Sequence, residues 1–380
     1  MASLSFELLK TDGAARLGRL TTPHSTFQTP MFMPVGTQAT VKGLTPRMVE
    51  ECGASILLGN TYHLALRPGP EIIAELGGLH RFMDWSGSIL TDSGGYQIFS
   101  LAEQRKITDA GAVFRSHLDG ALLELSPERA VAIQEMLGSD IAMVLDECPP
   151  GLAAPEVIRE AMRRSILWAR RCRDAQRRAD QAQFAIVQGG LNVAWRIECA
   201  EELIRLDFPG YALGGFSVGE PTPEMLRVLG EVAQVLPVQK PRYLMGVGKP
   251  EDMLCGIARG IDLFDCVLPT RNGRNAQALT WAGPLRLRNA IHKRSERPLD
   301  EDCSCYTCQR FTRAYLNHLF HAEEMLGPTL ISLHNVHFYL DLMKQARLAI
   351  LENRFNSFLS QNLVRWQQST YNLHSDKESS

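Results

Sequence analysis

The chain lacks the features that mark membrane and secreted proteins. None of its apolar stretches approaches the ~20 residues that a helix needs to cross a bilayer. The first residues, "MASLSFELLKTDGAARLG", show no basic segment followed by an apolar one. Six of its nine cysteines are scattered singly, which is typical of reduced thiols rather than of a disulfide framework. We therefore expect a cytoplasmic protein with no membrane partner.

An excess of one charge is also missing. The formal net charge is −2 over 380 residues. This balance neither demands nor excludes a polyanionic partner, because nucleic-acid binding needs a local basic face rather than a basic total. With 45% hydrophobic and 22% charged residues, the composition is that of a globular protein with a large core.

Short apolar, β-rich runs recur along the first 270 residues, separated by helical patterns. Three of the helical patterns begin with a hydroxyl residue before a proline, at 45–46, 126–127 and 222–223. Strands that alternate with helices predict an α/β fold, here a parallel (β/α)8 TIM barrel. The runs occupy residues 32–36, 55–59, 88–92, 141–146, 184–188, 211–215, 243–247 and 263–267.

Polar side chains gather where these runs end. They are Asp92, Asp146, Gln188 and Asp265. Active sites of such barrels lie at the carboxyl ends of the strands, so these groups would share one rim. The alternative is that strand ends simply meet polar loops. Three carboxylates and an amide on one rim favour a site.

The two carboxylates Asp92 and Asp265 suit glycosyl transfer. One carboxylate attacks the anomeric carbon and the other moves a proton. Asp146 and Gln188 suit the edge of a purine, because a carboxylate accepts from N–H groups and an amide donates to a carbonyl oxygen. Tyr96, after two glycines, can stack on such a ring.

The cations Arg271 and Arg274 follow the last run and suit phosphate or another anion. The alternative is a surface turn with solvated arginines. The arginine-rich stretch 158–180 is interpreted as an exterior helix with a solvated cationic face, in preference to an RNA-binding surface.

Three cysteines cluster in "DCSCYTC", at Cys303, Cys305 and Cys308. Three thiolates at this spacing can hold Zn²⁺ with a fourth ligand, and the alternatives are a redox or accidental cluster. Spacing alone leaves four histidines open as that ligand: His318, His321, His334 and His337. A site with four protein ligands has no open position, so the metal would be structural.

The cluster also predicts the domain organisation. It follows a basic, turn-rich stretch (271–297) and precedes a helical pattern from about 332 to 358. We expect a barrel formed by 1–270 and 330–360, a zinc-binding subdomain over 271–329 inserted before the last helix, and a flexible tail over 361–380.

Several longer motifs occur in a recognisable order. They are "TDSGGYQ", "DECPP", "IVQGG", "GYALGGFSVGE", "YLMGVG", "FDCVLPTRNGRNA" and "CSCYTC" with "LHNVHF" beyond it. From about residue 6 to 358 the chain resembles bacterial tRNA-guanine transglycosylase, the queuine tRNA-ribosyltransferase family. The resemblance implies an irregular (β/α)8 barrel with an N-terminal sheet and a zinc subdomain. It also implies exchange of guanine at the wobble position of GUN-anticodon tRNAs for a 7-deazaguanine base.

The resemblance assigns a role to each matching residue. Asp265 resembles the nucleophile that forms a covalent ribosyl intermediate, and Asp92 the general acid/base. The residues that resemble the base-binding set are Tyr96, Asp146, Gln188, Gly215, Phe216 and Met245, with Tyr96 and Met245 on the two faces of the heterocycle. Arg271 and Arg274 match RNA-contacting positions. His334 matches the fourth ligand of one structural Zn²⁺.

Other readings within and outside the family remain. Cys148 and Val218 resemble the bacterial choice, which favours 7-aminomethyl-7-deazaguanine over queuine, whereas Phe216 replaces the usual bacterial leucine. A queuine-specific or archaeosine-type enzyme, or a non-catalytic tRNA-binding subunit, is the alternative. Retention of both Asp92 and Asp265 argues against the last of these. Lys42 matches a position associated with a homodimer.

Overall fold

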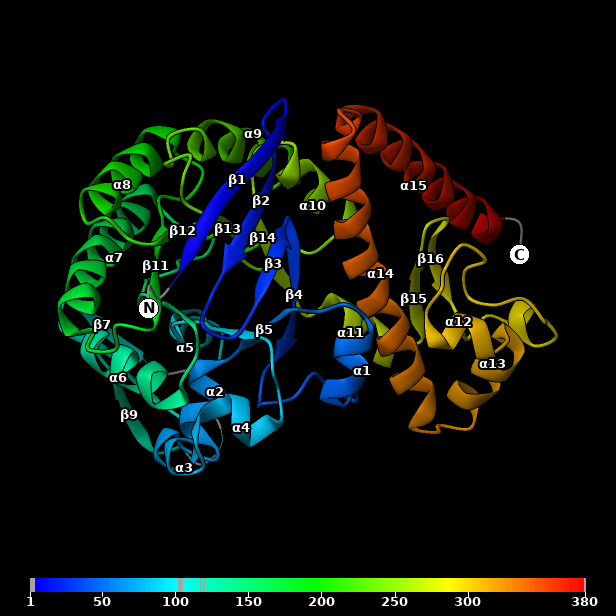
Figure 1. Ribbon diagram of the computed structural model, residues 1–380, viewed down its shortest axis with the longest axis horizontal. Coiled ribbons are helices and arrows are strands. Elements are labelled where there is room, and N and C mark those ends of the chain that lie inside the picture. Colours follow the sequence, from blue (N-terminus) through cyan, green and yellow to red (C-terminus); the bar gives the residue numbers. More distant parts are fainter. Residues whose placement is uncertain (1–3, 102–104, 117, 119, 379–380) are drawn as a thin grey trace.

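Eight parallel strands close into a barrel in the computed structural model, which describes residues 4–101, 105–116, 118 and 120–378 (Figure 1). The closure is made by β14, which pairs with β4. The strands are β4 (Met31–Gly36), β5 (Ile56–Gly59), β6 (Ser88–Thr91), β10 (Ile141–Met143), β11 (Ala182–Val187), β12 (Gly210–Leu213), β13 (Arg242–Leu244) and β14 (Leu263–Cys266). Each overlaps one of the eight predicted runs, although four of them begin one or two residues earlier, so the predicted barrel is confirmed.

The barrel strands are buried on both faces. All six residues of β11 are buried, because helices cover the outside of the barrel while the strands enclose its interior. Among the described residues, no helix combines the length and apolar character needed to cross a membrane. The outer helices are α1 (Pro46–Glu51), α2 (Thr61–Leu66), α3 (Pro70–Glu75), α4 (Gly78–Met83), α5 (Gly95–Leu101), α6 (Pro127–Leu137), α7 (Pro155–Ala175), α8 (Val193–Arg205), α9 (Thr222–Ala233) and α10 (Pro250–Ile257).

Two of the three predicted helix caps are confirmed. Thr45 and Ser126 accept hydrogen bonds from the backbone N–H three residues on, which satisfies a donor that the first turn leaves unpaired. The third prediction was wrong. Helix α9 already includes Thr222, and Pro221 stands at the cap position with no side-chain hydrogen bond.

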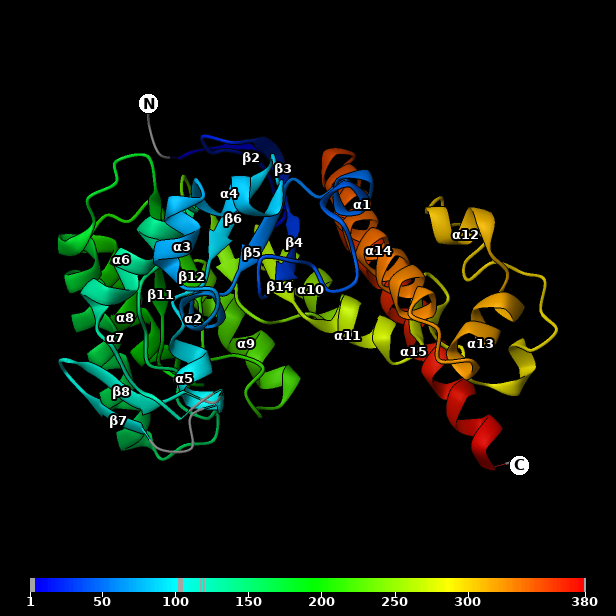
Figure 2. The same cartoon turned by 90° about the horizontal axis from the view of Figure 1, so that it is seen from below.

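A three-stranded antiparallel sheet covers the amino end of the barrel. It consists of β1 (Ser5–Asp12), β2 (Ala15–Thr21) and β3 (Thr26–Thr29). Arg16 forms an ion pair with Asp262, just before β14, at 3.2 Å, and Ser25 Oγ donates to the carbonyl of Ser55, just before β5, at 3.0 Å. Figure 2 shows this sheet at one end of the barrel and a second sheet at the other. That second sheet, β7 (Arg105–Thr108), β8 (Gly111–Arg115) and β9 (Leu122–Leu125), was not predicted.

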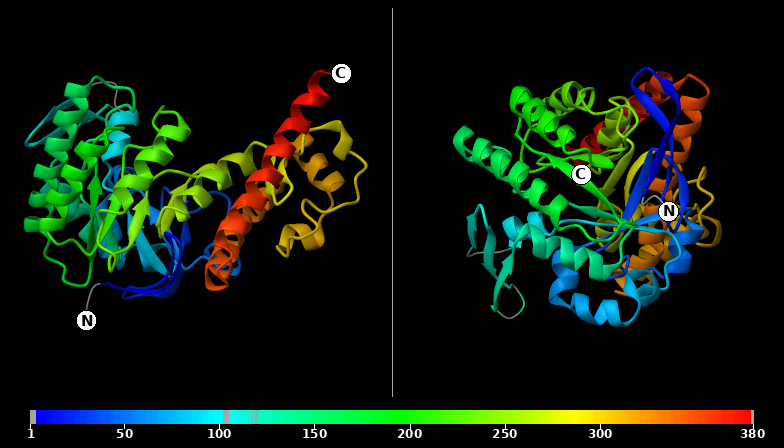
Figure 3. Two further views of the ribbon diagram at one scale, coloured as in Figure 1. Left: turned by 90° about the horizontal axis from the view of Figure 1, so that it is seen from above. Right: turned by 60° about the vertical axis from the view of Figure 1, so that its left-hand side comes forward.

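The cysteine-rich region forms a separate lobe beyond α14 (Leu326–Leu351) (Figures 2 and 3). Its core includes Leu287, Leu299, Leu316 and Ile331, which cluster apart from the main core. The domain limits themselves stay a prediction. Helix α11 (Leu268–Arg274) lies between the barrel and α14 (Figure 1). The lobe contains β15 (Gln277–Thr280), β16 (Gly283–Arg286), the 3₁₀ helix η1 (Ala290–His292), α12 (Tyr306–Arg310) and α13 (Arg313–His321).

The end of the chain differs from the sequence-based expectation. The predicted helix from 332 to 358 is in fact α14, which ends at Leu351, followed by α15 (Phe355–Glu378). The turn between them places Asn353 at a φ of +55°, a conformation that asparagine tolerates. Much of the segment expected to be a tail is therefore helical. Trp366 is buried there, with its ring 6.5 Å from that of Trp281.

Candidate active site

Asp92 lies directly after β6, where backbone and side-chain donors surround its carboxylate. Asn60 Nδ2 donates to Oδ2 at 2.6 Å, and the N–H of Thr61 donates to Oδ1 at 2.8 Å. Gly94 N–H and Gln97 Nε2 add two longer bonds, at 3.2 and 3.1 Å. Burial nevertheless raises the pKa of Asp92 to about 7, and the nearby Asp265 charge adds to the rise. The carboxyl can therefore exchange a proton near neutral pH.

Asp265 lies on β14, across the barrel from Asp92. Tyr243 Oη donates to its Oδ1 at 2.6 Å and Gly246 N–H donates to the same oxygen at 2.8 Å. Burial raises the pKa of Asp265, while these two donors oppose the rise. Oδ2 receives no hydrogen bond from the described residues. The carboxylate thus has one oxygen fixed and one available to react.

A second polar group brings together the ends of β6, β10 and β11. Gln188 Nε2 donates to Asp146 Oδ2 at 2.7 Å, and Ser93 Oγ donates to Oδ1 at 3.1 Å. Burial raises the pKa of Asp146 to about 6 in spite of these bonds. The structure therefore confirms that Asp146 and Gln188 are neighbours, as the shared rim predicted.

Gly215 lies against Gln188 and needs to be glycine. Its φ is +66°, and a Cβ there would stand 2.4 Å from Gln188 Oε1. Burial raises the pKa of the adjacent Cys148 thiol to about 12, while hydrogen bonds with Gln188 and with the Gly215 N–H oppose the rise. Phe216 is buried next to them. The Gly215 N–H and the Gln188 side-chain amide thus lie side by side next to Cys148.

The two residues expected to face a heterocycle lie on the same rim. Tyr96 is 51% exposed on α5, and Met245 is half-buried directly after β13. Gly95 directly precedes Tyr96, and a Cβ on it would stand 2.6 Å from the Asp146 carbonyl oxygen. The backbone that leads to Tyr96 therefore passes close to Asp146. That the two side chains enclose a base stays a prediction.

Arg271 and Arg274 are exposed on α11, which begins two residues after β14. Helix α11 is fixed to α14, because Asn335 Nδ2 on α14 donates to the carbonyl of Pro269 at 2.9 Å. Both guanidinium groups therefore belong to a fixed element beside the rim.

Of the four histidines that the sequence left open, His334 lies against all three cysteines, and His337 forms a hydrogen bond with Cys303. His334 Nδ1 lies 3.6, 3.4 and 3.3 Å from the sulfurs of Cys303, Cys305 and Cys308. Its Nε2 donates to the Leu279 carbonyl at 2.8 Å, which fixes Nδ1 as the ligand atom. Spacings of this size fit four ligands around one tetrahedral ion, so the group could hold a metal.

Sequence reasoning missed two residues that hold the carboxylates: Asn60, which binds Asp92, and Tyr243, which binds Asp265. Asn60 follows the run 55–59 directly, so its strand-end position was a usable signal, whereas Tyr243 was hidden inside an apolar run.

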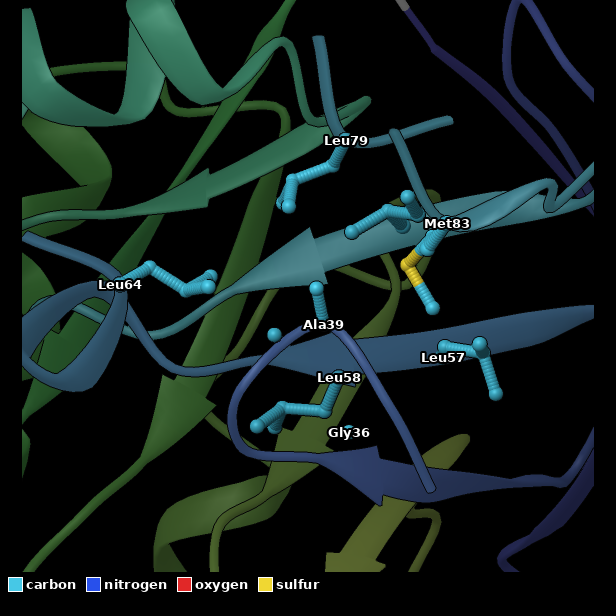
Figure 4. Close-up of a pocket in the computed structure, with 9 residues that line it drawn as sticks. Gly36, Ala39, Leu57, Leu58, Leu64, Leu79 and Met83 are labelled. Carbon is cyan, nitrogen blue, oxygen red and sulfur yellow. The ribbon is translucent and has the colours of Figure 1, made fainter. Parts of the chain in front are cut away.

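A small cavity beside β5 is unrelated to this chemistry (Figure 4). Its volume is about 10 Å³, room for about one water, and its lining is apolar, with Leu64, Leu79 and Met83 among the residues.

Comparison with known proteins shows the family of this chain. The family model for queuine tRNA-ribosyltransferase matches residues 11–368. Relatives of that name include one from Moorella thermoacetica, 55% identical over 93% of this chain and 95% of its own. Another, from Herpetosiphon aurantiacus, is 53% identical over 97% and 94%, and one from Listeria innocua 53% over 94% and 95%. The chain therefore belongs to the queuine tRNA-ribosyltransferase family.

Proposed function

We propose that the protein is a tRNA-guanine transglycosylase that exchanges guanine at the wobble position of GUN-anticodon tRNAs for 7-aminomethyl-7-deazaguanine. The observation that carries the proposal is the carboxylate pair. Asp265 has a free Oδ2, and Asp92 has a pKa of about 7. Both lie beside donors and acceptors suited to a purine edge.

The reaction needs two displacements at one carbon. Asp265 Oδ2 attacks C1′ of the ribose as the bond to guanine N9 breaks, and Asp92 gives its proton to that nitrogen. The product is an ester between Asp265 and the ribose. The incoming base then gives its ring N–H proton to Asp92 and attacks C1′, which frees the Asp265 carboxylate. Two inversions retain the configuration.

Base recognition would use the second polar group. Asp146 accepts from the N–H donors of the heterocycle, and Gln188 with the Gly215 N–H donates to its carbonyl oxygen. Tyr96 and Met245 offer stacking surfaces to a base that has left the anticodon stack. Arg271 and Arg274 contact the RNA backbone nearby.

The choice of base would depend on Cys148 and Val218. Cys148 is buried beside Gln188, and the Val218 carbonyl accepts from the Gly151 N–H at 3.3 Å, which holds the Val218 backbone against the loop after β10. Both side chains would crowd the bulkier queuine. A queuine-specific enzyme is the second candidate, favoured by the name that the relatives carry.

The remaining features fit an enzyme of this kind. We propose that the metal is Zn²⁺ and structural, since three thiolates and an imidazole leave no open position. Because Lys42 is exposed and matches an interface position of the family, we propose a homodimer. The tRNA substrate favours a cytoplasmic location.

The first prediction concerns the nucleophile. Asp265→Ala and Asp265→Asn should lower incorporation of labelled guanine into tRNA by roughly 10⁴-fold or more, because neither side chain can attack C1′. The covalent protein–tRNA species that the wild-type protein should show on a denaturing gel should be absent in both variants. Asp174→Asn, an exposed residue at the end of α7, is the matched control. Exchange at the wild-type rate in Asp265→Ala would remove the assignment.

The second prediction concerns pH. The pKa of Asp92 is raised from 3.8 to about 7, so the carboxyl keeps its proton up to neutrality and loses it above. Release of guanine in a single turnover should slow as pH rises through about 7, and slow again at low pH as Asp265 becomes protonated. Asp92→Asn should abolish the alkaline limb together with most activity. A release rate that climbs steadily from pH 7 to about 9 would contradict this role for Asp92.

The third prediction concerns the substrate. With unmodified tRNA, kcat/KM for 7-aminomethyl-7-deazaguanine should exceed that for queuine by roughly tenfold or more, since steric crowding in a pocket typically discriminates by such factors. Combined Cys148→Ala and Val218→Gly substitutions should narrow the difference. Equal values for the two bases with the wild-type protein would favour the queuine enzyme instead.

The fourth prediction concerns the metal. Cys305→Ser should remove about one equivalent of zinc and lower Tm, because a structural site contributes folding free energy. Activity should fall in proportion to the folded fraction. Cys255→Ser, half-buried on α10, should change neither property. A metal-free variant with unchanged Tm would contradict the structural role.

A further inference from the structure

Arg196, on α8, is a cation buried completely beneath the polar group. Its side chain is 0% exposed, and burial lowers the pKa of its guanidinium to about 10. Across residues 4–101, 105–116, 118 and 120–378, no carboxylate forms an ion pair with it. A buried charge without a counter-ion is costly, so its contacts must account for its presence.

Those contacts are backbone carbonyls at the ends of β11 and β12. Nη1 donates to the Val187 carbonyl at 3.2 Å, and Nη2 donates to the Gly214 carbonyl at 2.9 Å. Nε donates to the Gly190 carbonyl, and Nη2 makes a longer contact with that of Gly215. The guanidinium therefore ties together the two loops that supply Gln188 and Gly215.

One of these bonds determines where the Gly215 N–H points. The Gly214 carbonyl and the Gly215 N–H belong to a single peptide unit, in which the two groups point in opposite directions. Because the carbonyl is turned toward Arg196, the N–H is turned away from it, toward the region occupied by Cys148 and Gln188. Without the guanidinium, the glycines at 214 and 215 leave this peptide free to rotate.

The surroundings of Arg196 are shaped to admit it. Gly189 has a φ of +140°, and a Cβ there would stand 2.9 Å from Arg196 Cγ. On the other side, Arg196 Cζ lies 3.8 Å from the centre of the Phe216 ring, in cation–π contact. The guanidinium is thus held both by carbonyls and by the side chain next to the Gly215 peptide.

We propose that Arg196 is a positioning residue that determines base specificity by fixing the Gly214–Gly215 peptide. In this role it holds the Gly215 N–H ready for a heterocycle with a carbonyl oxygen, without touching the base itself. The inference rests on the proposed function, and it adds a buried residue that acts through the backbone.

The test is a split between the two substrates. Arg196→Lys replaces a planar fork by a point charge that cannot serve all these carbonyls. It should raise KM for guanine roughly tenfold, because the loss of one hydrogen bond to the base weakens binding by about that factor. It should change KM for tRNA less than about twofold. It should also reduce the preference for guanine over 2-aminopurine, which lacks the carbonyl oxygen, as competing bases. Arg205→Lys, exposed on the same helix, is the matched control and should change none of these.

Phe216→Leu provides a second variant in case Arg196→Lys does not fold. It keeps the guanidinium and removes the ring, so KM for guanine should rise about two- to threefold with Tm nearly unchanged. Wild-type KM for guanine in both variants would overturn the proposal, as would an equal rise in both KM values with a lower Tm. Absence of exchange in the wild-type protein would instead defeat the proposed function.

Discussion

The burial of three carboxylates at one end of the barrel is the constraint on which the site depends. Burial raises the pKa of Asp92, Asp146 and Asp265, so each carboxylate needs hydrogen-bond donors that stabilise its ionised form. Strand ends supply these donors, as at Gly246, whose N–H binds Asp265. The donors differ in number: Asp92 receives four and Asp265 receives two, both on one oxygen. The two carboxylates therefore have different environments, as the proposed roles of Asp92 as proton carrier and Asp265 as nucleophile require.

Helix α14 connects the cysteine cluster to this rim. His334 reaches the cluster, and Asn335, the next residue, binds the N–H of Leu279 at 2.8 Å and the carbonyl of Pro269 at 2.9 Å. Further along the helix, Tyr339 donates to the Gly248 carbonyl, in the loop that also provides the Gly246 N–H. One helix therefore links the cysteine cluster to α11 and to the loop that binds Asp265.

The parts of this architecture that the sequence predicted are those with a local signal. Strands of a parallel barrel are buried on both faces, so they appear as short apolar runs, and a polar residue at the end of each run identifies the rim. Tyr243 gave no such signal, because an aromatic inside a strand is normally core. Arg196 gave none either, since a helical arginine is normally solvated. The turn at 352–354 was also missed, because the apolar residues Phe355 and Phe358 continue the preceding pattern, although Phe358 packs against Trp281 and Phe355 packs against Phe358.

The distribution of paired and unpaired cations reconciles a net charge of −2 with a polyanionic substrate. Helix α7 is rich in arginine, but its guanidinium groups are largely neutralised: Arg159 pairs with Glu198, and Arg171 with Glu128. The stretch that looks most basic in the sequence therefore has little charge left for RNA, as its interpretation as an exterior helix anticipated. A polyanion responds to local, unneutralised charge within about a Debye length, roughly 8 Å at physiological ionic strength. Arg271 and Arg274 on α11 are exposed and form no ion pair with the described residues. In the proposed function, these local cations next to the rim would orient the RNA, which a larger basic total spread over the surface would not do.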